Sequence, residues 1–467
     1  MKKQNIIIIG LCVLSLTGCK SLKESLFKPY ERPEVNTKGI IRDNVSLTDT
    51  LVAKADTATF GKLPWKKVFT DPLLQQHIQK ALDNNVDLLN AALNIQIAEA
   101  QLKAAKLAFL PQFAFSPQGT IASWDFGKTA STYSLPIAAS WNVDLFGNLL
   151  SQKRAAQVQF LGMEDYQVVV KTNIVAGVAN MYYTLLMLDK QVEVLDSMTT
   201  LTKDTWEMMQ LQMNLGRARS TSVQSAEANY YSVQTQKVDM LRQIREVENS
   251  LSLVMGQPAQ AIPRGKLENQ NLPSEFSTGV GIQLLANRAD VHYAEMKLAQ
   301  CFYGIETARS RFYPSITISP TATFTNSAGG GVINPGKWLL SAVGSLTQPI
   351  FMKGQLTAGL RVAEAQYEQA YNSWQNAVLK AGSEVGDALV LYNSSDEKIQ
   401  LEKKQVETLQ KNVEHTRMLF KSSNSTYLEV IGAQQSLLNA QISLITDQFY
   451  KMQAVVNLYN ALGGGAN

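Results

Sequence analysis

The chain has 467 residues, of which 45% are hydrophobic and 18% charged, a composition typical of folded proteins that bury a large core. It excludes a largely disordered chain. The formal net charge is only +4, so nucleic acid is not an expected partner.

The N-terminus has the pattern of an export signal, which we assign to residues 1–18. Lys2 and Lys3 precede an apolar run that is too short to span a bilayer as a helix. The run ends in Leu-Thr-Gly-Cys, which resembles the bacterial lipobox, so Cys19 is the expected lipid attachment site. The alternative is a chance cysteine after an ordinary signal peptide. Residues 19–70 are expected to be a lipidated, extended segment.

The chain contains an internal two-fold repeat. Asp87 to Pro111 and Asp290 to Pro314 cover equal lengths, and several other residue types match at the same offset of 203 residues. Each repeat is expected to contain a helix, two strands and a long helical hairpin. We place the first repeat at 71–257, a linker or equatorial segment at 258–280, and the second repeat with a C-terminal tail at 281–467.

The positions of the prolines predict where the long helices run, because a proline inside a helix removes a hydrogen bond and clashes with the preceding turn. There is none in residues 137–257 and none after Pro349. A helix over residues 150–215 rises about 100 Å, which is several times the width of a compact domain.

Strands are predicted where apolar and polar residues alternate with a period of two. Alternation is clearest in residues 133–143 and 315–325 and weaker in 113–124 and 338–350, which predicts four strands in two hairpins. Such strands suit an outer-membrane β-barrel, since no other stretch is apolar enough for a membrane helix. The alternative is a soluble hairpin packed on the helices.

Four strands cannot close a barrel, because even small barrels need about eight and an open edge cannot lie in hydrocarbon with unpaired amides. Copies of the chain are therefore expected to share one barrel. Periodicity leaves the number of copies open.

The order of these features resembles the TolC-like outer-membrane efflux proteins, especially the lipoprotein branch that works with resistance-nodulation-division pumps. The resemblance covers nearly the whole chain. Besides the lipobox and the paired blocks, it rests on Trp65 with Phe69 and Asp71-Pro72-Leu73, Trp141-Asn-Val-Asp-Leu-Phe-Gly147, Gln348-Pro-Ile-Phe351, Glu384-Val-Gly-Asp-Ala-Leu389 and the segment from Tyr427 to Leu438.

The resemblance implies a mainly α fold with a membrane β-barrel. Long antiparallel helical hairpins form an α-barrel, and four strands per chain enter a shared, trimeric barrel of twelve strands. It further implies a homotrimer that is anchored by lipid in the cell outer membrane and extends into the periplasm. The resemblance implies that the protein is a passive exit duct for small molecules such as drugs and toxic compounds. It implies no cofactor. An inner-membrane resistance-nodulation-division pump drives export through a periplasmic adaptor protein.

The resemblance also implies two periplasmic hairpin tips that receive the adaptor. The first tip is formed by Leu215, Gly216 and Arg217. The second is formed by Ser422, Ser423, Asn424, Ser425, Thr426 and Tyr427. Relatives often carry an aspartate at this second turn, where it rings the entrance, and this chain departs from that pattern.

No catalytic or metal-binding motif is found. His77, His292 and His415 are isolated, and HExxH, CxxC, GxSxG and phosphate-loop patterns are missing, so we expect neither an enzyme nor a metal site. Asp144, just after the second strand, is a candidate lumen residue. The alternative is that it caps the following helix.

Two other functions remain open. A channel for type I protein secretion uses the same fold, and a non-channel periplasmic coiled-coil lipoprotein scaffold also has long helices. The lipidated N-terminus favours the efflux branch, and a scaffold does not need strands with a membrane period.

Overall fold

The structure of the protein is a computed structural model, which describes residues 28–34, 60–123, 125–273, 288–328, 331–422 and 426–466. The expected export signal and Cys19 lie outside these residues. Within the part of the chain that is described, no helix combines the length and the apolar character needed to cross a membrane.

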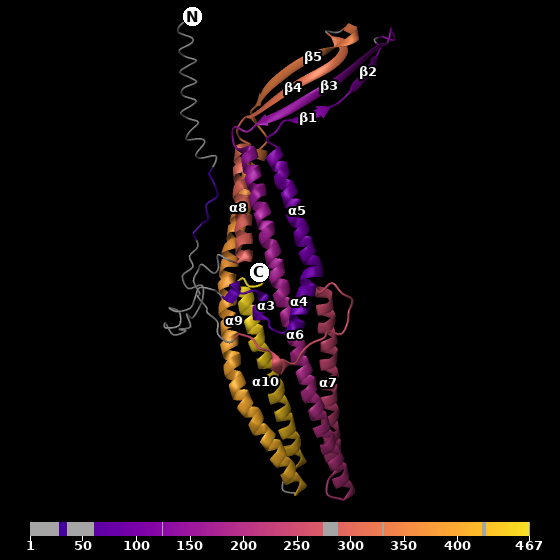
Figure 1. The fold of residues 1–467 in the computed structure, drawn as a ribbon, viewed down its shortest axis with the longest axis vertical. Helices are drawn as coiled ribbons and strands as arrows, with labels where there is room; N and C mark the ends of the chain where they lie inside the picture. Colours follow the sequence, from indigo (N-terminus) through magenta and orange to yellow (C-terminus); the bar gives the residue numbers. More distant parts are fainter. Residues whose placement is uncertain are drawn as a thin grey trace. The chain divides into compact units, whose positions relative to one another are not determined.

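The two-fold repeat is confirmed by three pairs of helices of equal length, with 22, 67 and 35 residues. The pairs are α5 (Val86–Leu107) with α8 (Ala289–Ser310), α6 (Asn148–Asn214) with α9 (Gln355–Lys421), and α7 (Ser220–Val254) with α10 (Tyr427–Ala461). In each repeat, strands follow the shorter helix and precede a long helical hairpin (Figure 1). The predicted fold class, mainly α with an internal repeat and one small set of strands, is therefore correct.

Two stretches of the segment before the first repeat, residues 28–34 and residues from 60 onward, lie within the described part of the chain. Residues 28–34 have no regular structure, and the Arg32 guanidinium binds the Glu295 carboxylate on α8. Residues 60–68 contain two short helices that the sequence did not predict, η1 (Phe60–Lys62) and α3 (Trp65–Val68). These helices form because Trp65 and Val68 are buried in the core, which propensity alone does not reveal.

The strands form one antiparallel sheet in the order β1-β3-β4-β5, with β2 also paired to β3. Their bounds are β1 (Gln112–Phe115), β2 (Gln118–Ala122), β3 (Ala130–Val143), β4 (Ser315–Ala328) and β5 (Gly331–Thr347). The first predicted strand is thus divided in two. Pro117 explains the break, because proline lacks the N–H that a ladder requires.

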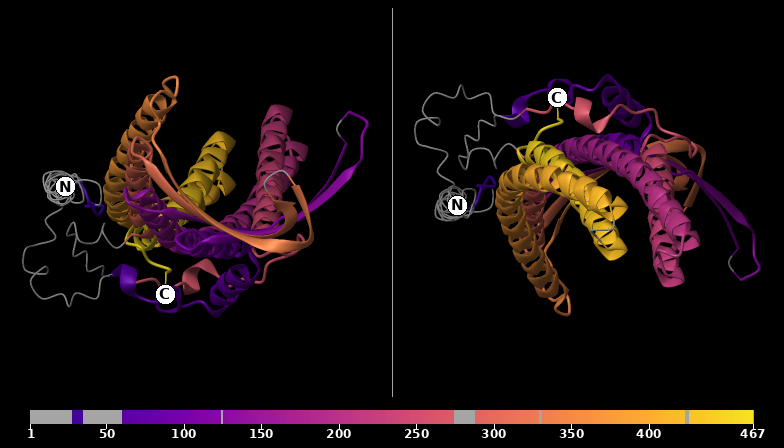
Figure 2. Two further views of the ribbon diagram at one scale, coloured as in Figure 1. Left: turned by 90° about the horizontal axis from the view of Figure 1, so that it is seen from above. Right: turned by 90° about the horizontal axis from the view of Figure 1, so that it is seen from below.

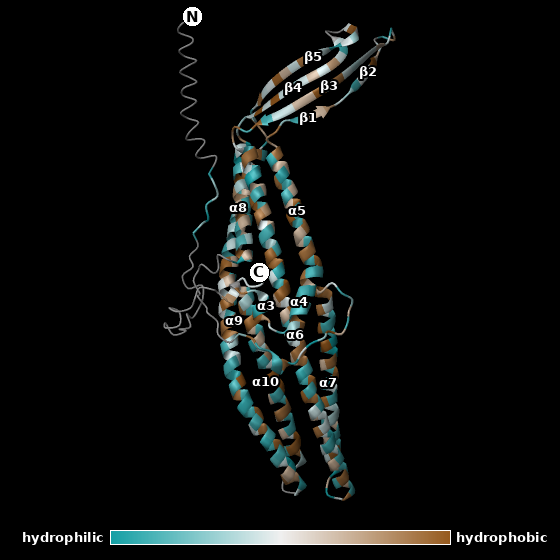
Figure 3. Ribbon diagram, in the orientation of Figure 1, coloured by the Kyte–Doolittle hydropathy of each residue, from teal (hydrophilic) through white to brown (hydrophobic). Residues whose placement is uncertain are grey.

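The sheet has one apolar and one polar face. Opposed residues of antiparallel strands share a face, and Leu135, Phe324 and Trp338 form one continuous apolar row. Asn142, Thr317 and Ser345 form a row on the other face. Figure 3 shows hydrophobic and hydrophilic residues interleaved along the strands.

The chain divides into two compact units. Unit 1 comprises Met1–Val35, Leu93–Glu164 and His292–Asn376, and unit 2 comprises Asn36–Ala92, Asp165–Val291 and Ala377–Asn467. The sheet belongs to unit 1, whereas unit 2 contains the ends of both long hairpins and the largest core. Each unit takes segments from both repeats.

The core of unit 2 includes polar side chains that tie three segments together. The Asp71 carboxylate caps α4 (Pro72–Asn84) by accepting the Leu73 N–H at 2.9 Å, and it accepts the Tyr182 hydroxyl of α6 at 2.7 Å. The Tyr182 oxygen in turn accepts the Gly265 N–H at 2.9 Å. Burial opposes ionisation, but the hydrogen bonds from Tyr182, Gln270 and Leu73 outweigh it and lower the pKa of Asp71.

Removal of the Tyr182 hydroxyl is expected to weaken this network. Tyr182→Phe leaves the Gly265 N–H without a partner and leaves Asp71 Oδ2 with the Gln270 amide as its remaining donor, so it should lower the free energy of unfolding by about 1–3 kcal/mol. Thermal unfolding in detergent measures the loss. Tyr450→Phe, on an exposed position of α10, is the matched control.

The same network predicts a pH dependence. Because the folded state lowers the pKa of Asp71, its stabilisation is present above the ordinary value of about 3.9 and is lost as the pH falls below it. Tyr182→Phe should reduce this acid sensitivity. If the midpoint temperature of unfolding changed by the same amount between about pH 7 and pH 3 in the wild type and in Tyr182→Phe, the assignment would be wrong.

Candidate functional site

The first predicted tip is a tight turn between α6 and α7. Gly216 adopts a left-handed conformation with φ +70°, and its N–H donates to the Met213 carbonyl at 2.9 Å. The Arg217 N–H reaches back to the Gln212 carbonyl at 2.8 Å. This pair of bonds is the Schellman motif, which ends a helix by satisfying its last carbonyls and favours glycine at the left-handed position. The hairpin turn predicted at these residues is therefore present.

The second predicted tip joins α9 to α10. The Thr426 hydroxyl accepts the Glu429 N–H at 3.4 Å, and the Glu429 carboxylate accepts the Thr426 N–H at 3.3 Å. This reciprocal arrangement is a capping box, which explains why α10 starts at Tyr427. Ser422 follows the last residue of α9, while Ser423, Asn424 and Ser425 lie outside the described residues.

The two tips pack against each other within unit 2. One buried cluster combines Met209 of α6, Val223 of α7, Phe420 of α9 and Val430 of α10. Seen from below, the hairpin of α9 and α10 and the hairpin of α6 and α7 lie side by side (Figure 2). The residues that close the tips therefore come from both repeats.

An aromatic pair extends this cluster. The Trp206 ring of α6 packs against the cluster and stacks on the Tyr230 ring of α7, with the ring centroids 5.6 Å apart. The stack joins the two helices of the first hairpin close to its turn.

Buried polar contacts also join the two hairpins. The Gln434 amide of α10, fully buried, donates to the Thr205 hydroxyl of α6 at 2.8 Å, and Gln435 donates to Asn229 of α7 at 3.1 Å. These four residues were not predicted from the sequence. The available signal was a pair of glutamines within the apolar periodicity of α10, where an amide needs a partner.

Exposed apolar side chains surround the tips. They are Leu211, Leu215, Met418, Leu419 and Leu428, all at least 48% exposed. Two acidic groups nearby are already engaged, since Asp204 pairs with Arg417 at 3.6 Å and Glu429 belongs to the capping box. The described part of the tips thus presents exposed apolar side chains beside exposed basic residues such as Arg217 and Lys421. An exposed apolar rim of this kind is typical of a surface that binds another protein.

Asp144 makes the contact expected of a helix cap. Its Oδ2 accepts the Leu150 N–H at 2.8 Å, in the first turn of α6. The side chain is half-buried. The lumen role remains a prediction, because it concerns a surface formed by several copies.

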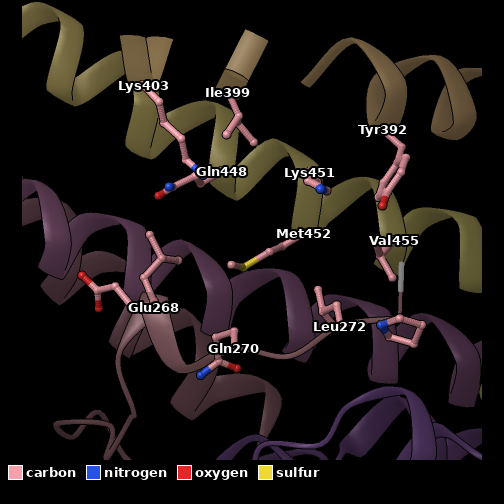
Figure 4. Close-up of a pocket in the computed structure, with 12 residues that line it drawn as sticks. Glu268, Gln270, Leu272, Tyr392, Ile399, Lys403, Gln448, Lys451, Met452 and Val455 are labelled. Atoms are coloured by element: carbon pink, nitrogen blue, oxygen red, sulfur yellow. The ribbon is translucent and has the colours of Figure 1, made fainter. Parts of the chain in front are cut away.

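A pocket of about 440 Å³ lies in unit 2 between α9, α10 and the segment that follows η2 (Leu267–Asn269). Figure 4 shows Ile399, Lys403, Gln448 and Met452 on the helical side and Glu268, Gln270 and Leu272 opposite. Two of its charged groups have partners: Lys451 binds Asp396, and Glu268 binds Lys190. Most charged groups that line the pocket are thus paired with other residues of the chain. This pairing does not indicate a catalytic centre.

The histidines do not form a metal site in the described residues, where no group of three or more His, Cys, Asp or Glu side chains is placed to hold an ion. His77 has a structural role. Its Nε2 lies 2.8 Å from the Pro263 carbonyl, and its ring lies 6.0 Å from that of Tyr182. Burial lowers the pKa of His77 and favours the neutral ring.

The comparisons with known proteins agree over most of the chain. The model of a family described as "Outer membrane efflux protein" matches residues 77–257 and 281–464. The cation efflux system protein CusC of Escherichia coli is 27% identical, over 98% of this chain and 99% of its own length. The toluene efflux pump outer membrane protein TtgF of Pseudomonas putida is 26% identical, over 99% of this chain and 97% of its own.

Solved structures share the fold. A crystal structure of CusC superposes with a TM-score of 0.81 at 24% identity, covering 94% of this chain and 99% of that one. The outer-membrane channel MtrE of Neisseria gonorrhoeae, in its open state, superposes with a TM-score of 0.80 at 24% identity, covering 94% and 98%. The arrangement of helices and strands is thus the one found in outer-membrane channels.

A substitution at the first tip tests its role. Gly216→Pro cannot adopt the left-handed conformation and removes the N–H that binds Met213. We expect normal assembly but loss of export, measured as drug resistance of cells that rely on this channel. Gly216→Asn, which tolerates the left-handed conformation, should keep resistance. Normal resistance with Gly216→Pro would count against the tip assignment.

Proposed function

Since this chain belongs to the outer membrane efflux protein family, we propose that three copies form the passive exit duct of an export system that an inner-membrane pump drives. The chain itself is an outer-membrane efflux protein. We propose in addition that the duct contains three copies and works with a pump and an adaptor. The single observation that carries the proposal is the sheet of unit 1, with its exposed apolar face and unpaired edges.

The sheet is incomplete in one copy. Within the described residues, β1 and β2 pair only with β3, and β5 pairs only with β4. The apolar face of the sheet is exposed as well. The exposed fraction is 47% for Ile137, 64% for Trp338 and 76% for Leu340. Lipid can cover that face, but it cannot bind the free edge amides, so strands of neighbouring copies must do so. This supports an assembly in which sheets join edge to edge around a pore.

Exposed apolar stripes on the long helices support the same assembly. On α9, Leu379, Val390 and Leu401 recur every 11 residues and are at least 54% exposed. On α7, Tyr231 and Val238 are also exposed. Figure 1 shows α9 and α7 as the outer members of the two hairpins in unit 2. An 11-residue repeat keeps a stripe on one side of a long helix, so the α9 edge of one copy suits the α7 edge of the next.

The apolar rim at the tips supports an adaptor partner. Leu211, Leu215 and Leu428 leave large apolar surfaces in water, and a partner helix with an apolar face would cover them. We propose that the periplasmic adaptor docks on Leu215 to Arg217 and on Ser422 to Tyr427. No energy source is implied for the channel itself, so the pump supplies the work.

The names of the relatives indicate more than one class of exported substance. At nearly equal identity they refer to cation and to toluene export, so identity does not separate ions from organic compounds. We propose toxic small molecules and drugs as cargo, selected by the pump. Cys19 is the proposed lipid attachment site, as in a relative of Salmonella typhimurium named a probable outer membrane lipoprotein, SilC. Membership of this family favours the efflux duct over the protein-secretion channel and the non-channel scaffold.

The proposal is tested by three measurements on the full-length protein. It should purify as a trimer, conduct ions in planar bilayers and restore drug resistance to a strain lacking its own channel. Val390→Asp places a charge in the expected seam between copies and should lower the temperature at which the trimer dissociates, whereas Val390→Leu should not. A water-soluble monomer, or a trimer without conductance, would overturn the proposal.

A separate measurement tests Asp144. Asp144→Asn keeps an oxygen that can cap α6 but removes the charge, so a lumen carboxylate predicts reduced cation selectivity of single channels. Asp144→Ala should additionally cost about 1 kcal/mol of stability through the lost cap. Unchanged selectivity in both variants would leave Asp144 as a helix cap only.

A further inference from the structure

A segment near the N-terminus is fixed on α8 within unit 1. The Arg32 Nε donates to Glu295 Oε1 at 2.8 Å. The Tyr30 N–H donates to the Tyr303 hydroxyl at 3.2 Å. A charged contact and a hydrogen bond thus hold residues 28–34 against this helix.

Lys28, at the start of this segment, lies among other basic residues. Its carbonyl oxygen is 3.4 Å from Arg154 Nη1 on α6. On α8, Arg309 binds the Glu306 carboxylate at 2.9 Å. Burial raises the pKa of Glu306, and the charges of Arg309 and Lys28 oppose the rise. Together with Lys153, which precedes Arg154 on α6, these basic residues form what we call the junction cluster: Lys28, Lys153, Arg154 and Arg309.

The positive charge of the junction cluster is only partly compensated by the chain. The Glu306 side chain is 6% exposed, whereas that of its partner arginine is 49% exposed, so the acid is inside and the base faces the surface. Among the described residues, no carboxylate forms an ion pair with Lys28 or Lys153. The acidic residues nearest to these lysines in the sequence, Glu31 and Asp144, pair with no member of the cluster. A ligand that approaches this surface therefore meets net positive charge.

The junction cluster lies where the helices join the sheet (Figure 1). Because α6 begins at Asn148, Lys153 is about 8 Å along it, and Arg309 is next to the last residue of α8. The apolar face of the sheet ends at Trp141, whose indole N–H donates to the Phe109 carbonyl at 2.9 Å. The Phe109 ring centroid lies 5.9 Å from Lys153 Nζ. An indole ring at the end of an apolar face is typical of the boundary between hydrocarbon and headgroups.

The proposed lipid attachment site also brings this surface close to the membrane. Cys19 lies nine residues before Lys28, and nine residues of fully extended chain span at most about 30 Å. A lipid on Cys19 therefore keeps Lys28 within about 30 Å of the membrane surface.

We propose that the junction cluster binds the phosphate group of an anionic phospholipid in the membrane leaflet that faces the periplasm. Arginine and lysine bind phosphate through charge-assisted hydrogen bonds, and basic residues are attracted to an anionic membrane surface. The acyl chains of the same lipid lie against the apolar face of the sheet, which adjoins the cluster. The inference rests on the proposed position of the sheet in the membrane and adds a ligand to it.

Electron spin resonance tests the site on the full-length protein in phosphatidylcholine vesicles. Spin-labelled phosphatidylglycerol should associate with the protein several-fold more strongly than spin-labelled phosphatidylcholine. The preference should shrink in about 0.5 M NaCl, because salt screens the attraction. Inorganic phosphate at the same ionic strength should reduce the preference no more than chloride does.

Substitutions show whether the preference comes from the junction cluster. Lys153→Gln combined with Arg154→Gln removes two charges, so the two lipids should associate almost equally. Lys28→Gln changes a residue without an ion pair in the described chain, so the fold is retained and the preference should fall in part. Lys404→Gln combined with Arg245→Gln, on exposed positions of α9 and α7, is the matched control and should keep the wild-type preference.

Two results would overturn the lipid site: equal association of both lipids with the wild type, or a preference that survives both in the double variant and in Lys28→Gln. A preference that inorganic phosphate removes at matched ionic strength indicates a site for free phosphate instead. Bilayer conductance of the same samples tests the proposed function separately. A protein that shows the preference but no conductance refutes the duct and supports the lipid site. Channels without the preference refute the lipid site and support the duct.

Discussion

The unpaired edges of the β sheet are the constraint on which this protein's assembly depends. Every strand needs a neighbour for its backbone N–H and C=O groups, and in one copy β1, β2 and β5 each lack a neighbour on one side within the described residues. One face of the same sheet is apolar and exposed. Water satisfies the edges but not the face, and lipid satisfies the face but not the edges. Further copies in a bilayer satisfy both at once.

The two-fold repeat determines where the two long helical hairpins turn. Because α6 and α9 have the same length, as do α7 and α10, each repeat ends in a hairpin that turns at a corresponding point. The turns are built differently: the first ends a helix with a left-handed glycine, and the second starts one with a capping box. Both solutions satisfy helix-terminal backbone groups, so the two tips can pack on one apolar cluster.

The interior of unit 2 is held by polar groups as well as by apolar packing. Asp71, Arg264 and Gln434 each join segments that lie far apart in the sequence. Where donors and acceptors match, as around Asp71, burial is compensated.

Sequence patterns alone predicted the long helices, the repeat and the alternating strands. The absence of prolines, the constant offset and the period of two can be read from the chain without a structure. Proline is excluded from helix interiors by backbone sterics, and side chains along a strand point alternately to its two faces. The hairpin tips at Leu215 to Arg217 and at Ser422 to Tyr427 were expected from the family resemblance, and the structure adds the Schellman motif at the first and the capping box at the second. The tertiary structure decided the short helices before Asp71, the break at Pro117 and the contact between Gln434 and Thr205. Each depends on which segments meet in space, and a buried amide or acid acquires its role only from the partner that the fold brings to it.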